Sequence, residues 1–247
     1  IRDIGGVETV DHLQVKSGRL FRGGFLGHLS EEDIEIIDSL NLTDIIDFRS
    51  SREHRERPDY VPSGVMVHNF PPFDDHIDEE NKKLADANLL WFVSKEKSGF
   101  DYMAEMYADL MVDEQAVTAW KNFFHTILSK EDGVFYFHCS QGKDRAGLAA
   151  FMLEIALGID FETAKQDYLF SNVAMKIRIE YLLNMIKNKP FYNEKYHQSF
   201  IDVFSAKEEY LMRSIEAMEK AGDGTIISYI KNVLEVDIDK LRKIYLE

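Results

Sequence analysis

A ten-residue segment of this chain, residues 138–147, brings a thiol, a carboxylate and two cations together. It reads HCSQGKDRAG, and five residues separate Cys139 from Arg145. A thiolate is a strong nucleophile, and backbone N–H groups that precede a helix form a binding site for anions. The spacing therefore predicts a loop that binds a phosphate group and a cysteine that attacks its phosphorus atom.

The same loop must keep the thiol ionised. A free cysteine has a pKa of about 8.5, so attack at neutral pH requires N–H donors or positive charge beside the sulfur. The amides of residues 140–145, at the start of a helix, can supply both, while the planar guanidinium of Arg145 can hold two phosphate oxygens. Gly142 allows close approach of the backbone, and Lys143 adds a cation suited to a substrate with more than one phosphate. The expected phosphate ligands are Ser140, Gln141, Gly142, Lys143 and Arg145.

Departure of an alkoxide or phenoxide from phosphorus is easier when a general acid protonates it. Two places in the sequence can supply that acid. Asp144 lies inside the loop, whereas Asp74 and Asp75 follow a predicted strand. We expect Asp144 to act because its proximity to Cys139 is assured, and the pair at 74 and 75 is the alternative.

Three further polar residues border the apolar segments. His138 precedes the cysteine, and we expect it to order the loop through hydrogen bonds. Arg22 and Arg49 are candidates for the pocket lining, although an arginine that follows a strand is more often a surface ion-pair partner. The eight histidines include neither an HExxH motif nor a close ligand pair, so we expect no metal and no cofactor.

The flanks of the loop predict the elements that position it. Residues 134–137 (VFYF) are apolar throughout and too short for a helix, which indicates a central strand covered on both faces. Residues 146–157 are apolar almost all round and precede Gly158, as in a buried helix closed by a glycine. The loop therefore connects a strand to a buried helix.

The rest of the chain predicts an α/β fold with a central, mostly parallel sheet flanked by helices. A capping box at Ser30 begins a helix over residues 30–40, and strands are expected at 44–48 and 65–70. A helical insertion is expected at 77–98, helices that pack on the sheet at 100–129, and helices only beyond residue 160. No linker or repeat divides the chain, which predicts a single domain over 1–247. The segment 77–112 could form a helical lid, with Trp91 and Phe92 facing the substrate, or pack into the core.

Further segments resemble the atypical bacterial protein-tyrosine/serine phosphatases that carry the HCxxGKDR loop, a family with some members that also act on phosphoinositides. These segments are RDIGG (2–6), LFRGG (20–24), IDFRS (46–50) with Glu53, DYL (167–169) with Ser171 and Asn172, and LRKIYL (241–246). The resemblance spans nearly the whole chain. It implies a cysteine-phosphatase fold without a metal cofactor, with Cys139 as nucleophile, Arg145 as phosphate ligand and a functionally important Asp144.

One position departs from the family pattern. The residue after the arginine is commonly Thr or Ser in that family, and its hydroxyl helps to stabilise the thiolate and to hydrolyse the phosphoenzyme. This chain has Ala146 there. We therefore expect slow breakdown of the phosphocysteine intermediate.

Composition limits the partners. The chain has 44 acidic and 29 basic residues, a net charge of −15 and one cysteine. Such a surface repels nucleic acid and broad anionic membrane surfaces unless basic residues gather locally. No apolar stretch is long enough to span a bilayer and no signal peptide opens the chain, which predicts a cytoplasmic protein without stable membrane insertion. Because the first residue is Ile, secretion after removal of a leader is also open.

These features predict a cysteine-dependent phosphatase that acts through a phosphocysteine intermediate. The expected substrate is a phosphotyrosine-bearing protein, with phosphoserine, phosphothreonine or phosphoinositide monoesters as further candidates. One alternative is a phosphate-binding pseudophosphatase with little turnover. A sulfur-transfer enzyme is a weaker alternative because Arg145 closes a loop of phosphate size. The sequence leaves the oligomeric state open.

Overall fold

The computed structural model describes residues 1–73, 98–190 and 192–247. A five-stranded sheet lies at its centre, in the order β1-β2-β5-β3-β4. Only β1 runs antiparallel to its neighbour, which confirms the predicted, mostly parallel sheet. The strands are β1 (Arg2–Asp3), β2 (Leu20–Gly23), β3 (Asp44–Asp47), β4 (Met66–Asn69) and β5 (Phe135–His138).

Strand β5 lies in the middle of the sheet, and all four of its residues are buried. Successive side chains of a strand point to opposite faces, so each face needs its own apolar cover. Tyr136 belongs to a small cluster with Ile37 and Ile45, whereas Phe135 and Phe137 belong to the main core on the other face. The prediction of a strand covered on both faces at 134–137 is thus confirmed, with the observed strand beginning and ending one residue later.

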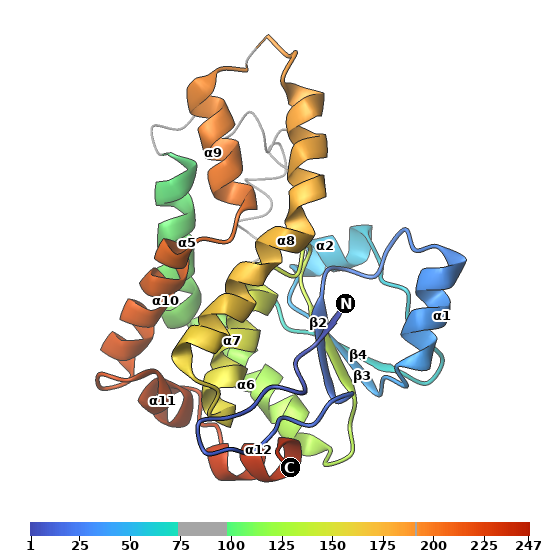
Figure 1. Ribbon diagram of the computed structural model, residues 1–247, viewed down its shortest axis with the longest axis vertical. Coiled ribbons are helices and arrows are strands. Elements are labelled where there is room, and N and C mark those ends of the chain that lie inside the picture. The colour runs from blue at the N-terminus through green and yellow to red at the C-terminus, as the bar shows by residue number, and fades with distance from the viewer. Residues whose placement is uncertain (74–97, 191) are drawn as a thin grey trace.

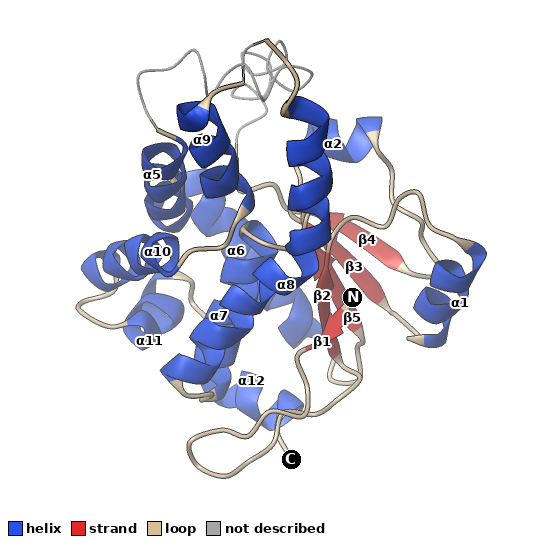
Figure 2. Cartoon of the chain, turned by 45° about the horizontal axis from the view of Figure 1, so that its top comes forward, coloured by secondary structure: helices blue, strands red, loops and turns tan. Residues whose placement is uncertain are grey.

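The helices cover the two faces unequally (Figure 2). Helix α1 (Glu31–Ser39) lies on one side of the sheet, the thicker helical layer lies on the other, and the short α2 (Ser51–Glu56) lies beyond the ends of the strands. That layer contains α5 (Gly99–Val112), α6 (Glu114–Ser129), α7 (Arg145–Leu157), α8 (Phe161–Ile186), α9 (Glu194–Phe204), α10 (Glu208–Ala221), α11 (Ile226–Ser228), the π-helical turn η1 (Tyr229–Val233) and α12 (Ile238–Tyr245). Figure 1 shows that α8 extends well beyond the strands.

Two predicted helix boundaries are confirmed in detail. The side chain of Ser30 accepts a hydrogen bond from the Asp33 amide, and the Asp33 carboxylate accepts one in return from the Ser30 amide, which completes a capping box. Helix α7 is buried along almost its whole length and ends at Gly158, which has φ +91°. This left-handed conformation favours glycine, and it ends the helix where the sequence predicted.

The packing of residues 100–129 is only partly as predicted. Helix α6 packs Phe123 against Phe48 of the strand end and Phe137 of β5, with ring centroids 5.5 and 5.1 Å apart. Helix α5 packs instead against α10, α9 and α6. It belongs to the helical layer, so the second half of the proposed lid is core. Residues 77–97, with Trp91 and Phe92, lie outside the described residues, and no described helix is long and apolar enough to cross a bilayer.

Candidate active site

The candidate site lies at the carboxyl edge of the sheet, where ligand sites of parallel sheets form. The loop leaves β5 after His138, and α7 begins at Arg145. Gly142 has φ +70°, and a Cβ there would lie 2.5 Å from the backbone of Gly23 at the end of β2. Both facts require glycine, so the predicted close approach of the backbone at this position is confirmed.

Cys139 is the first residue of this loop, and it is buried, with 2 % of its surface exposed. Ala146 is fully buried in the first turn of α7, and Ser140 is half-buried. Gln141 is exposed at the tip of the loop. Cys139 thus lies buried at the floor of the loop, below the exposed loop tip.

The guanidinium of Arg145 is held at the opening of the loop by three acceptors. It donates to Glu53 Oε2 at 3.0 Å, to the Phe48 carbonyl at 3.1 Å and to Ser140 Oγ at 3.2 Å. Burial lowers the pKa of Arg145, but the carboxylate of Glu53 and the charge of Cys139 raise it above its ordinary value. Arg145 is therefore a permanent cation held beside the cysteine.

Glu53 has a role that its place in the sequence does not reveal. It caps α2 through the Ser50 amide, accepts a hydrogen bond from Ser140 Oγ and pairs with Arg145. Burial opposes ionisation, but the charge of Arg145 and these hydrogen bonds lower the pKa of Glu53 to about 2. The carboxylate is thus ionised at neutral pH and orients the arginine.

We expect Glu53→Gln to destabilise the protein in a pH-dependent way. The lowered pKa favours the folded state above the ordinary carboxyl pKa of 4.5, and this contribution is lost as the pH falls toward 2. The free energy of unfolding should therefore fall by roughly 2–3 kcal/mol at pH 7 and by clearly less near pH 3. Urea unfolding at both pH values measures this, with the exposed Glu216→Gln as the matched control; an equal loss at both pH values would point to packing instead.

Asp144 is anchored from the helical layer. Its Oδ1 accepts a hydrogen bond from Tyr107 Oη at 2.5 Å, and Tyr107 in turn accepts one from Tyr168 Oη at 2.9 Å. Both tyrosines are fully buried, and burial followed by the charge of Asp144 raises the pKa of each. The two hydroxyls therefore act as hydrogen-bond donors in series, which fixes one oxygen of Asp144.

Lys143 points away from the predicted phosphate position. Its side chain is 1 % exposed, and its Nζ donates to Asp144 Oδ1 at 2.6 Å and to the carbonyls of Val203 and Ser205 at 3.0 and 3.3 Å. These carbonyls belong to the segment where α9 ends. The ammonium thus ties the loop to α9 and fixes Asp144 from a second direction.

Arg22 and Arg49 are ion-pair partners, but the expectation that an arginine of this kind lies on the surface was wrong, since both are buried. Arg22 donates to Asp167 at 2.6 Å, to Ser171 Oγ at 2.8 Å and to the Gly142 carbonyl at 3.3 Å. It therefore supports the loop from beneath and connects it to α8. A side-chain pair 145 residues apart in sequence cannot be inferred from local pattern.

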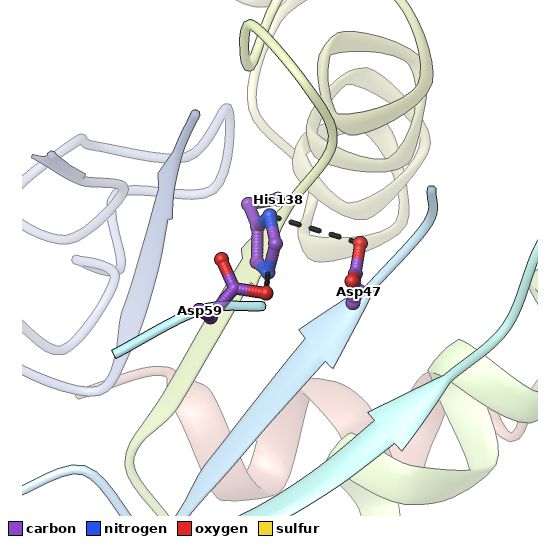
Figure 3. Close-up of side chains that lie close together, drawn as sticks. All are labelled: Asp47, Asp59 and His138. Atoms are coloured by element: carbon purple, nitrogen blue, oxygen red, sulfur yellow. Dashed lines mark ion pairs between the residues drawn. The ribbon is translucent and has the colours of Figure 1, made fainter. Parts of the chain in front are cut away.

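Arg49 occupies the centre of a second buried cluster. Asp47, Asp59 and His138 lie near enough to one another to hold a metal ion (Figure 3). Arg49 bonds Asp47 Oδ2 at 2.7 Å and also pairs with Asp59, so its guanidinium already compensates both carboxylates. Burial lowers the pKa of His138, which disfavours a further cation there. These donors therefore form a buried ion-pair network rather than a suitable metal site.

His138 lies between the carboxylates of that cluster. Its Nδ1 is 3.8 Å from Asp47 Oδ1 and its Nε2 is 3.6 Å from Asp59 Oδ2 (Figure 3). The ring is stacked on that of Tyr136. Nδ1 also lies 3.2 Å from the Cys139 carbonyl. The ring therefore contacts the backbone at the start of the loop, on the side of the strand away from the thiol.

The geometry brings together most of the residues predicted for the site. Cys139, Ser140, Asp144 and Arg145 converge on the loop, while Lys143 turns into α9 and Gln141 faces solvent. The alternative acids Asp74 and Asp75 lie outside the described residues. Three functional contacts were missed by sequence reasoning: Tyr107, Tyr168 and the pairing of Glu53 with Arg145. The family-like segments pointed to Glu53 and Tyr168 without giving their contacts, and no local pattern pointed to the hydrogen bond of Tyr107.

Comparison with known proteins shows to which family the chain belongs. The model of the Tyrosine phosphatase family matches residues 1–247. A Cupriavidus necator protein, named as a predicted tyrosine-protein phosphatase, is 27 % identical over 99 % of this chain and 85 % of its own length. The triple specificity protein phosphatase PtpB of Mycobacterium tuberculosis is 32 % identical over 69 % of this chain and 66 % of its own length. A tyrosine-protein phosphatase of Nostoc commune is 26 % identical over 59 % of this chain and 46 % of its own length. The resemblance drawn from the motifs is confirmed, and this chain belongs to the tyrosine phosphatase family.

Proposed function

We propose that this phosphatase hydrolyses phosphate monoesters by two displacements at phosphorus, with Cys139 as the nucleophile. The observation that supports this best is the placement of a permanent cation, Arg145, at the opening of a loop whose floor is a shielded thiol. The loop amides and the guanidinium would bind three oxygens of the phosphate and face its bridging oxygen outward. Sulfur would then lie opposite the leaving group, as in-line attack requires.

In the first step the sulfur–phosphorus bond forms and the bond to the bridging oxygen breaks. The reacting form of the enzyme carries a proton on Oδ2 of Asp144, and Asp144 gives this proton to that oxygen, so the alcohol or phenol leaves neutral. In the second step water attacks phosphorus, Asp144 takes back a proton and the phosphorus–sulfur bond breaks. Oδ1 of Asp144 is engaged by Tyr107 and Lys143, which leaves Oδ2 for this proton transfer.

We expect Asp144→Asn to lower kcat/KM, which reports the first step, by about 10²-fold on phenyl phosphate, because a poor leaving group depends on the proton. On p-nitrophenyl phosphate, whose phenolate leaves readily, the loss should stay below about tenfold. Steady-state kinetics across a series of aryl phosphates measures the difference as a steeper dependence on the leaving-group pKa. A dependence identical to that of the unmodified enzyme would transfer the role of general acid to Asp74 or Asp75.

For the substrate we propose phosphotyrosine in proteins, with phosphoserine, phosphothreonine and phosphoinositides as further candidates. A relative that covers 69 % of this chain is named a triple specificity protein phosphatase, which supports a broad range. Lys143 is bound to Asp144 and to two carbonyls, so a second phosphate would need cations from elsewhere on the surface.

The test is phosphate release from phosphotyrosyl peptides, phosphoseryl peptides and phosphoinositides, each with Cys139→Ser as control. We expect the fastest release from phosphotyrosyl peptides, together with a phosphocysteine intermediate in rapid-quench samples because Ala146 lacks the hydroxyl that assists hydrolysis. Release from none of the three classes, with phosphate still bound, would favour the pseudophosphatase. Release that survives the Cys139→Ser change would refute the proposed nucleophile.

We further propose that residues 1–247 form a single phosphatase domain that works in the cytoplasm. A catalytic thiol requires a reducing compartment to remain free, and Cys139 is the only cysteine in the chain. Recovery of activity from the protein after isolation with and without a thiol reductant measures this dependence.

A further inference from the structure

The outer half of α8 has two apolar sides, and within the described part of the chain one of them packs against α9. Ile179, Leu183 and Ile186 lie in a cluster with Tyr196 and Phe200 of α9. This contact holds the two helices together beyond the end of the sheet (Figures 1 and 2). The residues on the opposite side of α8 take no part in this cluster of described residues.

That opposite side carries a stripe of exposed apolar residues. They recur at every fourth position, and their exposed fractions are 63 % for Val173, 79 % for Ile177, 56 % for Tyr181 and 55 % for Met185. At about 3.6 residues per turn, this spacing places the four side chains along one face of the helix over about 18 Å. Scattered exposed apolar residues are ordinary, but a continuous helical row of them indicates a contact surface.

Basic residues border this stripe, although the whole chain is strongly acidic. Lys176 and Arg178 are exposed and lie on opposite edges of the helical face, and Lys187 and Lys189 are exposed directly after the helix. Glu180 is the only acidic residue between 172 and 190, in a chain of net charge −15. The basic side chains have thus gathered where the apolar side chains are exposed.

We propose that the outer half of α8 binds anionic lipid surfaces. In an interfacial helix the apolar row enters the boundary between headgroups and acyl chains, and long basic side chains at its edges reach the phosphates. Each such residue is attracted to the negative charge of an anionic surface. A second copy of this chain fits less well, because self-association would bring two basic rims together, and nucleic acid gives the apolar row no partner.

The acidic remainder of the protein surface then determines how the protein is oriented on the membrane. It is repelled by anionic headgroups, so α8 is the face that can approach the membrane. Ser171 of α8 accepts a hydrogen bond from Arg22, which also donates to Gly142 of the phosphate loop. Ile177 is six residues further along, or about 9 Å of helix. Docking would therefore hold the catalytic loop close to the lipid surface, where, if the proposed function holds, phosphoinositide headgroups are substrates.

The test is flotation with vesicles of phosphatidylcholine alone and of equal parts phosphatidylcholine and phosphatidylserine. We expect binding to the mixed vesicles only, and a loss of about tenfold or more in the double variants Ile177→Asn/Tyr181→Asn and Lys176→Glu/Lys187→Glu. The matched controls are Ile36→Asn on α1 and Lys220→Glu/Lys231→Glu on α10 and η1, which should bind as the unmodified protein does. Hydrolysis of a soluble aryl phosphate should be unchanged in all of them.

Each contrary outcome has a distinct meaning. Absence of binding to the mixed vesicles, or equal binding by the α8 variants and the controls, would overturn the proposal. A dimer in light scattering that Ile177→Asn/Tyr181→Asn dissociates, without lipid binding, would assign the stripe to a second copy. Flotation does not depend on turnover, so we expect Cys139→Ser to bind the mixed vesicles as the unmodified protein does. Lipid binding is thus tested independently of the proposed chemistry.

Discussion

Replacing Cys139 with serine is expected to abolish turnover, lowering kcat by about 10⁴-fold or more, while phosphate binding persists. A serine hydroxyl remains protonated at neutral pH and needs a general base to attack phosphorus. The adjacent His138 cannot supply it, since its ring nitrogens face Asp47 and Asp59 (Figure 3). The variant keeps the loop amides and Arg145, so the phosphate site itself is retained.

Two measurements separate loss of chemistry from loss of the site. Isothermal titration with inorganic phosphate should give a dissociation constant for Cys139→Ser within about threefold of the unmodified enzyme, since the binding groups are intact. Because the chain has one cysteine, iodoacetamide labelling reports on Cys139 alone, and phosphate should slow it. Turnover above about 1 % in the serine variant would require another nucleophile.

The fold was predictable where one segment contained its own signal. Helix α7 is apolar almost all round and closed by Gly158, and β5 is a largely apolar run that precedes the loop, so both were identified without knowledge of their partners. Strands β1 and β2 were not predicted. They are two and four residues long, and β2 contains Arg22, whose burial depends on Asp167 and Ser171 of α8. Such short strands are defined by their neighbours in the sheet rather than by their own periodicity.

The candidate site likewise contains residues that the sequence could predict and contacts that only the tertiary structure shows. Cys139, Asp144 and Arg145 lie within one loop, so their proximity follows from the sequence alone. Tyr107 is 37 residues from Asp144, and the helical spacing indicated only a core aromatic residue. It is in the core, yet its hydroxyl bonds the carboxylate, because a buried phenol needs an acceptor. Residue type predicted the burial of Tyr107, but only the tertiary structure identifies its hydrogen-bond partner.

Arg145→Lys is expected to lower kcat/KM by about 10³-fold, although the substitution preserves the charge. In the free enzyme three acceptors use separate N–H groups of the guanidinium: Glu53, the Phe48 carbonyl and Ser140 Oγ. We expect two of these N–H groups to bind phosphate oxygens and to follow them as negative charge shifts in the transition state. An ammonium can keep the pairing with Glu53, but it is a point charge without the planar fork, so the oxygens would lose their paired donors.

This loss should fall on turnover more than on stability. Because the charge that pairs with Glu53 is kept, we expect the free energy of unfolding of Arg145→Lys to change by less than about 1 kcal/mol, in contrast to Glu53→Gln. The matched control is Arg213→Lys on the exposed surface of α10, where both readouts should be unchanged. Kinetics on phosphotyrosyl peptide and urea unfolding of the same samples provide the comparison. Activity within about tenfold of the unmodified enzyme would mean that charge alone suffices, and the bidentate role of Arg145 would be refuted.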